Sequence, residues 1–200
     1  MRYVTLFIFA LLLILSGCAS SGRTVKRIST TEVTDLSGRW NDTDARLVSE
    51  EMIGDMLTRP WFSNFLKGKG KNPVVIVGTI RNMSSEHVDM ELFTKDMERE
   101  LINSGQVQFV ASKVEREEIR DERIDQQMYA SIETAKKLGE EVGADFVLIG
   151  TFKSVEDVIE GKKAVLYSVD LELIDVEKNL KVWIGNKKIK KLIEQAGYQW

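Results

Sequence analysis

Two side chains with nucleophilic or acid-base chemistry occur once each in this sequence of 200 residues, Cys18 and His87. A thiol can attack a carbonyl, bind a metal or accept a lipid, and an imidazole is the usual base that activates a nucleophile. One residue of each kind excludes the usual zinc sites, which take several Cys and His ligands. No G-x-S-x-G or S-x-x-K block with its companions is present, and no glycine fingerprint for a dinucleotide follows a predicted strand. We therefore predict no catalytic, cofactor or metal site. A hydrolase that uses carboxylates alone is the one enzyme class left open.

The segment in front of Cys18 gives its thiol a different chemistry. Arg2 precedes an apolar run, Tyr3–Leu15, and small residues then lead to Leu15-Ser16-Gly17-Cys18. The run is shorter than the roughly 20 residues that a membrane-spanning helix needs, but it fits the apolar region of a signal peptide. The four residues match a lipobox. The sequence predicts a signal peptide over residues 1–17, cleavage before Cys18, a diacylglycerol on its sulfur and an acyl chain such as palmitate on the new amine.

Lipidation of Cys18 predicts where the protein lies and how far it reaches. Two or more acyl chains give stable anchoring. No Asp occupies the second position after cleavage, where Ala19 stands, and by the enterobacterial sorting rule this favours the outer membrane, with the protein facing the periplasm. Residues 18–30 are polar and small and predict a flexible tether. From Cys18 to Thr31 it spans at most about 45 Å when extended and about 20 Å as a coil.

Residues 31–200 are predicted to form a single globular periplasmic domain. Hydrophobic residues make up 43% of the chain and charged residues 30%, which is typical of a folded domain rather than a disordered one. With its only Cys lipidated, the domain must fold without a disulfide. The net charge of −3 is spread over both signs, so nucleic acid is excluded as a partner. No small-molecule substrate is indicated.

Helices are predicted in the first part of the domain. Thr31–Leu36 allows a short edge strand, and Asn41-Asp42-Thr43-Asp44 lacks the third ligand position, the Gly and the bidentate Glu of a calcium loop. Asp42 or Thr43 is instead expected to cap a helix that ends at Thr58-Arg59-Pro60. Its apolar stripe consists of Val48, Met52 and Met56, widened by Leu47, Ile53 and Leu57. A second short helix carries Trp61, Phe62, Phe65 and Leu66 and stops at Gly68.

A strand–helix–strand unit follows. The β-branched run in Pro73–Ile80 predicts a strand covered on both faces. A helix with one apolar face then runs to Ser104 and is closed by Gly105, and Val107–Val110 forms the next strand. A right-handed crossover of this kind places the two strands parallel.

The remaining residues predict two further helices and an antiparallel meander. Lys113–Asp125 mixes both charges at helical spacing and indicates a solvated helix, and Ser131–Val142 indicates an amphipathic one. A buried strand starts at Phe146 and continues through Phe152 and Val155, and two more strands follow, from Val165 and from Leu180. Five lysines near the end most simply discourage edge-to-edge aggregation, with a basic contact patch as the alternative. They are Lys181, Lys187, Lys188, Lys190 and Lys191. The fold class is therefore α+β: a mixed sheet with a parallel βαβ start and a C-terminal three-stranded antiparallel meander, with helices packed on the sheet.

Three stretches carry a resemblance to a known family. They are Ala135–Gly150, Val169–Gly185 with Trp183, and Arg39-Trp40-Asn41 with Asp44 and Val48-Ser49. Over roughly Thr31 to Lys191 the chain resembles the LpoB-type outer-membrane lipoproteins, which activate bifunctional penicillin-binding proteins. The order of helix, Gly, buried strand and meander is also similar to the amino-terminal domain of TolB.

The resemblance implies a non-catalytic role. Such a lipoprotein binds a class A penicillin-binding protein and favours the more active arrangement of its transpeptidase and glycosyltransferase domains in peptidoglycan synthesis. The residues that would contact this partner do not transfer from the family, so the partner-binding surface is left unassigned and Cys18 is the one predicted site. The alternative is a structural or assembly lipoprotein of an envelope secretion or flagellar complex that uses the same fold.

Overall fold

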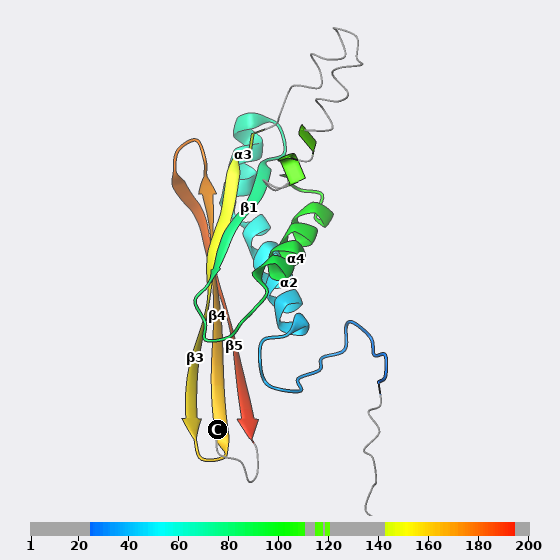
Figure 1. Ribbon diagram of the computed structural model, residues 1–200. Coiled ribbons are helices and arrows are strands. Elements are labelled where there is room, and N and C mark those ends of the chain that lie inside the picture. Colours follow the sequence, from blue (N-terminus) through cyan, green and yellow to red (C-terminus); the bar gives the residue numbers. More distant parts are fainter. Residues whose placement is uncertain (1–24, 111–114, 118, 121–142, 195–200) are drawn as a thin grey trace, which may run out of the picture. The chain divides into compact units, whose positions relative to one another are not determined.

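A computed structural model of the chain describes residues 25–110, 115–117, 119–120 and 143–194 (Figure 1). The chain divides into two compact units, Met1–Glu32 and Val33–Trp200. The described part of the first unit, residues 25–32, contains no helix or strand. Cys18 and the helix predicted over Ser131–Val142 lie outside the described residues, and the charged segment is described only at residues 115–117 and 119–120, which are helical.

Three long helices form where the apolar periodicity predicts them, namely α2 (Asp42–Thr58), α3 (Pro60–Lys69) and α4 (Met90–Asn103). α2 begins one residue earlier than predicted, because Asn41 is its N-cap. The Asn41 side chain accepts a hydrogen bond from the Asp44 backbone N–H, and the Asp44 carboxylate accepts one from the Asn41 N–H. This reciprocal pair satisfies two N–H groups at the helix start, which neither Asp42 nor Thr43 does.

The second unit contains a five-stranded sheet in the order β2-β1-β3-β4-β5. Its strands are β1 (Val74–Asn82), β2 (Gln108–Phe109), β3 (Phe146–Ile159), β4 (Lys162–Asp175) and β5 (Leu180–Glu194). β1 is parallel to both β2 and β3, whereas β3, β4 and β5 form an antiparallel meander. The predicted α+β class is confirmed, with its parallel start, its meander and its helices on the sheet.

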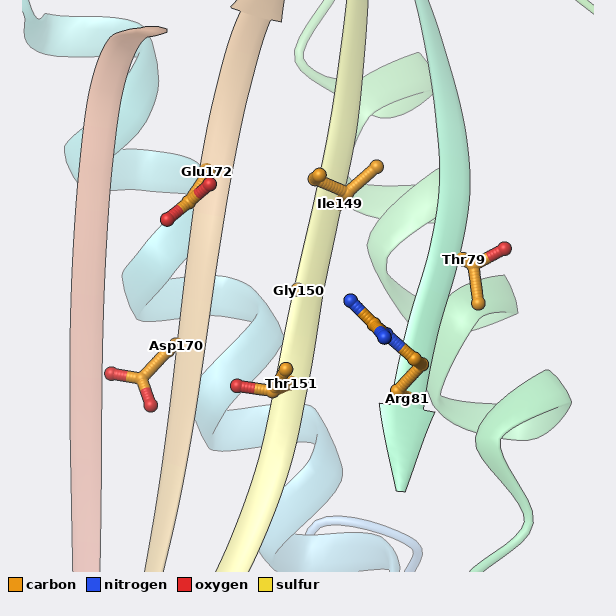
Figure 2. A pocket seen from close by; sticks show the side chains of 7 residues that line it. All are labelled: Thr79, Arg81, Ile149, Gly150, Thr151, Asp170 and Glu172. Atoms are coloured by element: carbon orange, nitrogen blue, oxygen red, sulfur yellow. The ribbon is translucent and has the colours of Figure 1, made fainter. Parts of the chain in front are cut away.

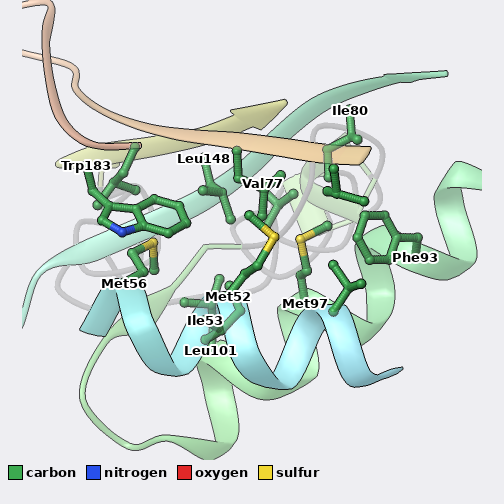
Figure 3. Packing of buried hydrophobic residues seen from close by; sticks show 14 of the residues in the cluster. Met52, Ile53, Met56, Val77, Ile80, Phe93, Met97, Leu101, Leu148 and Trp183 are labelled. Carbon is green, nitrogen blue, oxygen red and sulfur yellow. The ribbon is translucent and has the colours of Figure 1, made fainter. Parts of the chain in front are cut away.

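The core lies between one face of the sheet and helices α2 and α4 (Figures 1 and 3). Met52, Ile53 and Met56 of α2 point toward the strands, and Met97 and Leu101 of α4 fill the same layer. Trp183 of β5 closes this layer over α2, and its indole N–H donates to the Asp55 carboxylate at 2.9 Å. Leu47, predicted to widen the stripe of α2, is 42% exposed.

The meander extends beyond the two long helices, and there a segment from the start of the unit packs against it. This N-terminal strap, residues 33–41, contains no strand, so the edge strand predicted over Thr31–Leu36 is wrong. The strap contributes Trp40, whose ring meets those of Phe93, Phe152 and Tyr167 at centroid distances of 5.9, 4.7 and 5.6 Å. It is held by side chains, through rings and polar contacts, rather than by a strand ladder.

Two expectations about the strands need correction. β3 is not buried as far as Val155, because this side chain lies past the helices, in the exposed part of the strand. In β1, Val75 and Val77 are buried against the helices, whereas Ile76 on the other face is only half-buried and Thr79 is exposed. A run of β-branched residues therefore predicted the strand correctly but overstated how much of both faces the described residues cover.

Candidate partner-binding face

The sheet face opposite α2 and α4, here the second face, contains a shallow hollow of about 470 Å³ (Figure 2). β1, β3 and β4 line it side by side, and the helices visible in this view lie behind the strands. The lining residues are Thr79, Arg81, Ile149, Gly150, Thr151, Asp170 and Glu172. Most of them are polar, and they come from three neighbouring strands, so a partner would meet a rigid surface rather than a loop.

The shape of the hollow follows from small residues in the strands. The pairing of β1 with β3 shifts register between Val77 and Ile80, which places Gly78 in a bulge. A Cβ on Gly78 would lie 3.0 Å from side-chain carbons of Val147 and Ile149, so the two strands could not pack this closely with a larger residue. On β3, a Cβ on Gly150 would lie 2.4 Å from the carbonyl oxygen of Asp170. Both glycines permit close strand packing at the centre of this face.

Arg81 is the charged group of the hollow that is available for a ligand. The two acids of the hollow are engaged: Asp170 accepts from Asn186 at 2.6 Å and pairs with Lys153 at 3.4 Å, and Glu172 pairs with Lys181 at 2.7 Å. Arg81 is exposed and has no ion pair among the described residues. A guanidinium presents a planar fork of donors that suits a carboxylate or a carbonyl oxygen. The hollow can therefore bind an acidic or amide group of a partner.

Nothing in this arrangement supplies a nucleophile. His87 lies in the exposed loop after β1, beside a separate cavity of about 190 Å³, and no hydroxyl within the described residues hydrogen-bonds to it. Within residues 25–110, 115–117, 119–120 and 143–194, no group of three His, Cys, Asp or Glu side chains is placed to hold a metal ion. No helix in the described part of the chain is long and apolar enough to cross a membrane.

A buried ionic cluster that the sequence reasoning missed holds the strap to β5. Lys191 is only 9% exposed, so the interpretation of this residue as an edge-protecting lysine is wrong. Its ammonium lies 2.5 Å from the Asp35 carboxylate, 2.6 Å from the Asp44 carboxylate and 3.0 Å from the Arg39 carbonyl oxygen. The hydrogen bond from Lys191 lowers the pKa of Asp35, whereas burial raises the pKa of Asp44. Hydrogen bonds to both carboxylates outweigh burial and raise the pKa of Lys191.

A second polar contact closes the strap over β4. The Tyr167 hydroxyl lies 2.5 Å from the Glu86 carboxylate and 3.3 Å from the Gly38 carbonyl oxygen. The backbone N–H of Trp40 donates to the same carboxylate. Burial and the Glu86 carboxylate together raise the pKa of Tyr167. In the sequence, Tyr167 is only one of the alternating apolar residues of the strand that begins at Val165. Its partner Glu86 lies in a loop 81 residues earlier, so no local pattern could connect them.

Comparison with known proteins identifies the family. The family model described as peptidoglycan-synthase activator LpoB matches residues 44–189, which span α2 to most of β5. The chain belongs to the LpoB family. The predicted resemblance to LpoB-type proteins is thereby confirmed. Because the family is named for activation of a synthase, membership agrees with the prediction of a protein that binds rather than catalyses.

Several solved structures are similar to the chain. The LpoB C-terminal domain from Escherichia coli is 15% identical, with a TM-score of 0.46, and the match covers 74% of this chain and 99% of that one. The LpoB C-terminal domain from Salmonella enterica is 16% identical over the same shares, with a TM-score of 0.43. The lipoprotein GNA1162 from Neisseria meningitidis is 16% identical, with a TM-score of 0.37, over 64% of this chain and 87% of that one. No curated protein matches the chain.

Proposed function

We propose that this protein is an outer-membrane lipoprotein, anchored through Cys18 and facing the periplasm, that binds and activates a bifunctional class A penicillin-binding protein. The match of the LpoB family model over residues 44–189 carries the proposal. The lipobox at Leu15–Cys18 supports the anchor. The protein contributes no catalytic group to the synthase and acts by binding alone.

Activation by binding alone sets a thermodynamic requirement. A ligand shifts the synthase toward its active arrangement only if it binds that arrangement more tightly than the resting one. The hollow on the second face is a suitable contact surface because most of its lining residues are polar and it is built on three strands. Its exposed guanidinium, Arg81, is positioned to pair with a carboxylate of the synthase. A contact of this kind can discriminate between two arrangements if only one of them brings the carboxylate within reach.

The test uses residues 18–200 with Cys18→Ser, which contain the whole second unit. This chain is expected to retain a purified class A penicillin-binding protein in a pull-down and to raise its glycan polymerisation. Arg81→Ala is expected to weaken binding about tenfold, since a charge-assisted hydrogen bond contributes roughly 1.5–3 kcal/mol. Arg46→Ala on α2 is the matched control, because Arg46 already pairs with Glu50 at 3.1 Å.

Two results would contradict the proposal. Absence of both binding and stimulation would exclude the synthase as the partner. Ring-like oligomers of the chain in solution, without synthase binding, would favour the alternative role in an envelope assembly. The anchor is tested separately in cells: the wild-type chain is expected to incorporate labelled palmitate and to fractionate with the outer membrane, and Cys18→Ser is expected to do neither.

A further inference from the structure

The end of the meander that lies past the helices exposes large apolar side chains. Val155 and Ile159 of β3 are 65% and 72% exposed, and Leu192 of β5 is 66% exposed. All three lie on the second face, and the register joins them: Val155 pairs with Leu166, and Leu192 pairs with Ala164 on the same strand as Leu166. Val155, Leu166 and Leu192 are neighbours, and Ile159 lies beyond Asp157 on the same face of β3. These four residues are here the anchor-end patch. Clustered exposed apolar residues of this kind mark an interaction site.

Two lysines border this patch on the same face. Lys188 and Lys190 pair in register with Ser168 and Leu166, and both are exposed. Neither has an ion pair among the described residues, whereas on the opposite face Lys187 binds Glu51 and Lys191 binds Asp35 of the strap and Asp44 of α2. Asp157 on this face and Glu160 in the turn beside it are exposed acids, and Glu194 is paired with Lys162 at 2.7 Å. The patch is therefore apolar, with two lysines on its β5 side and two acids on its β3 side.

The position of the patch in the chain indicates what it meets. The second unit begins at Val33, and Asp35 is fixed to Lys191, one residue before Leu192. The chain that carries Cys18 therefore joins the unit beside the patch. β4 runs from Lys162 at this end to Asp175 at the other, a distance of about 43 Å. A lipid attached to Cys18 would tether the unit to the bilayer at this end of the sheet.

We propose that the anchor-end patch contacts an anionic phospholipid surface. Exposed apolar residues bordered by lysines are the chemistry that binds the interface of such a membrane. The proposal rests on the proposed anchoring at Cys18 for its placement. It adds that the domain itself touches the membrane at this end of the sheet.

The test uses residues 18–200 with Cys18→Ser and vesicles of phosphatidylethanolamine with phosphatidylglycerol, compared with vesicles of phosphatidylcholine. The chain is expected to float with the anionic vesicles and to bind them less as salt is raised. Val155→Ser with Leu192→Ser is expected to lower the partition coefficient at least about tenfold. Lys188→Gln with Lys190→Gln is expected to lower it about 25-fold on anionic vesicles only, since each lysine near the surface contributes about fivefold.

The matched control is Leu180→Ser with Ile184→Ser. These residues are 57% and 64% exposed at the other end of β5, and their substitution is expected to leave binding unchanged. No binding to anionic vesicles, or an equal loss in the control, would overturn the proposal. So would a dimer that the patch substitutions convert to a monomer in sedimentation, because the occupant would then be a second copy. The synthase pull-down is done in solution without lipid, so failure of one assay is distinguishable from failure of the other.

Discussion

The two halves of the meander are covered in different ways. Toward Phe146 and Asp175, α2 and α4 bury the sheet with methionine, leucine and aromatic side chains. Toward Ile159 and Lys162, the strap covers the same face through Trp40, a buried ionic cluster and a tyrosine hydroxyl. The stability that apolar packing provides depends on the area buried, whereas the attachment of the strap depends on the protonation and geometry of a few groups. The comparison implies that the helix half carries most of the stability and that the strap half responds to single polar changes.

The largest effect is expected for Leu148→Ala in the helix half. Leu148 is fully buried, and removal of a buried leucine side chain destabilises a domain by about 4 kcal/mol through lost burial and the cavity left behind. Val155→Ala on the same strand is the control, and its exposed side chain should change the free energy of unfolding by less than about 0.5 kcal/mol. Urea unfolding followed by circular dichroism measures both. Similar losses for the two variants would show that the halves do not differ in packing.

A slightly smaller effect is expected for Lys191→Met in the strap half. The substitution leaves the Asp44 carboxylate buried without its counter-charge, which costs about 3 kcal/mol. Lys188→Met, three residues earlier on the exposed face, is expected to stay within about 0.5 kcal/mol of the wild type. If both substitutions were neutral, the ionic cluster would not hold the strap.

The sequence predicted the helix half better than the strap half, for physical reasons. Periodicity of apolar residues reports packing, and it located α2, α3, α4 and all five strands. The contacts of the strap join residues far apart in the chain, such as Asp35 with Lys191 and Glu86 with Tyr167, and no spacing rule connects them. Lys191 resembles its exposed neighbours in sequence and differs from them only by facing the strap. Arg81 lies near the end of β1 and belongs to no motif, so its place in the hollow depends on the strand register.

The ionic cluster of Lys191, Asp35 and Asp44 makes the stability of the strap half depend on pH. The pKa of Asp35 lies below its usual value of 3.8, so its contribution to stability is present above that pH and is lost as the pH falls through the lowered pKa. The pKa of Lys191 lies above 10.5, so its contribution is present below that pH and is lost as the pH rises through the raised pKa. Burial raises the pKa of Asp44. Protonation of Asp44 in acid therefore favours the folded state, whereas protonation of Asp35 disfavours it.

These shifts set the range in which Lys191→Met should matter most. The difference in unfolding free energy between the wild type and this variant is expected to be largest between about pH 4 and pH 10 and to shrink on both sides. The Leu148→Ala difference should be nearly constant over the same range, because no titrating group contacts that core position directly. Unfolding curves at a series of pH values measure both. A constant difference for Lys191→Met would show that its effect is steric rather than ionic.

The smallest change in the free energy of unfolding is expected when a helix N-cap is removed. The caps of α2 and α4 differ in whether they also hold the strap. Asn41 caps α2 and also donates to the Thr34 carbonyl oxygen and the Asp35 carboxylate, whereas Asp89 caps α4 alone. Loss of a cap costs about 1 kcal/mol in either helix. Asn41→Ala should in addition release the strap, because two of its hydrogen bonds to residues 34–35 disappear. Amide exchange is expected to speed up over residues 33–41 in Asn41→Ala and to remain unchanged there in Asp89→Ala. Equal exchange in the two variants would mean that the strap is held by Trp40 and Lys191 without help from the start of α2.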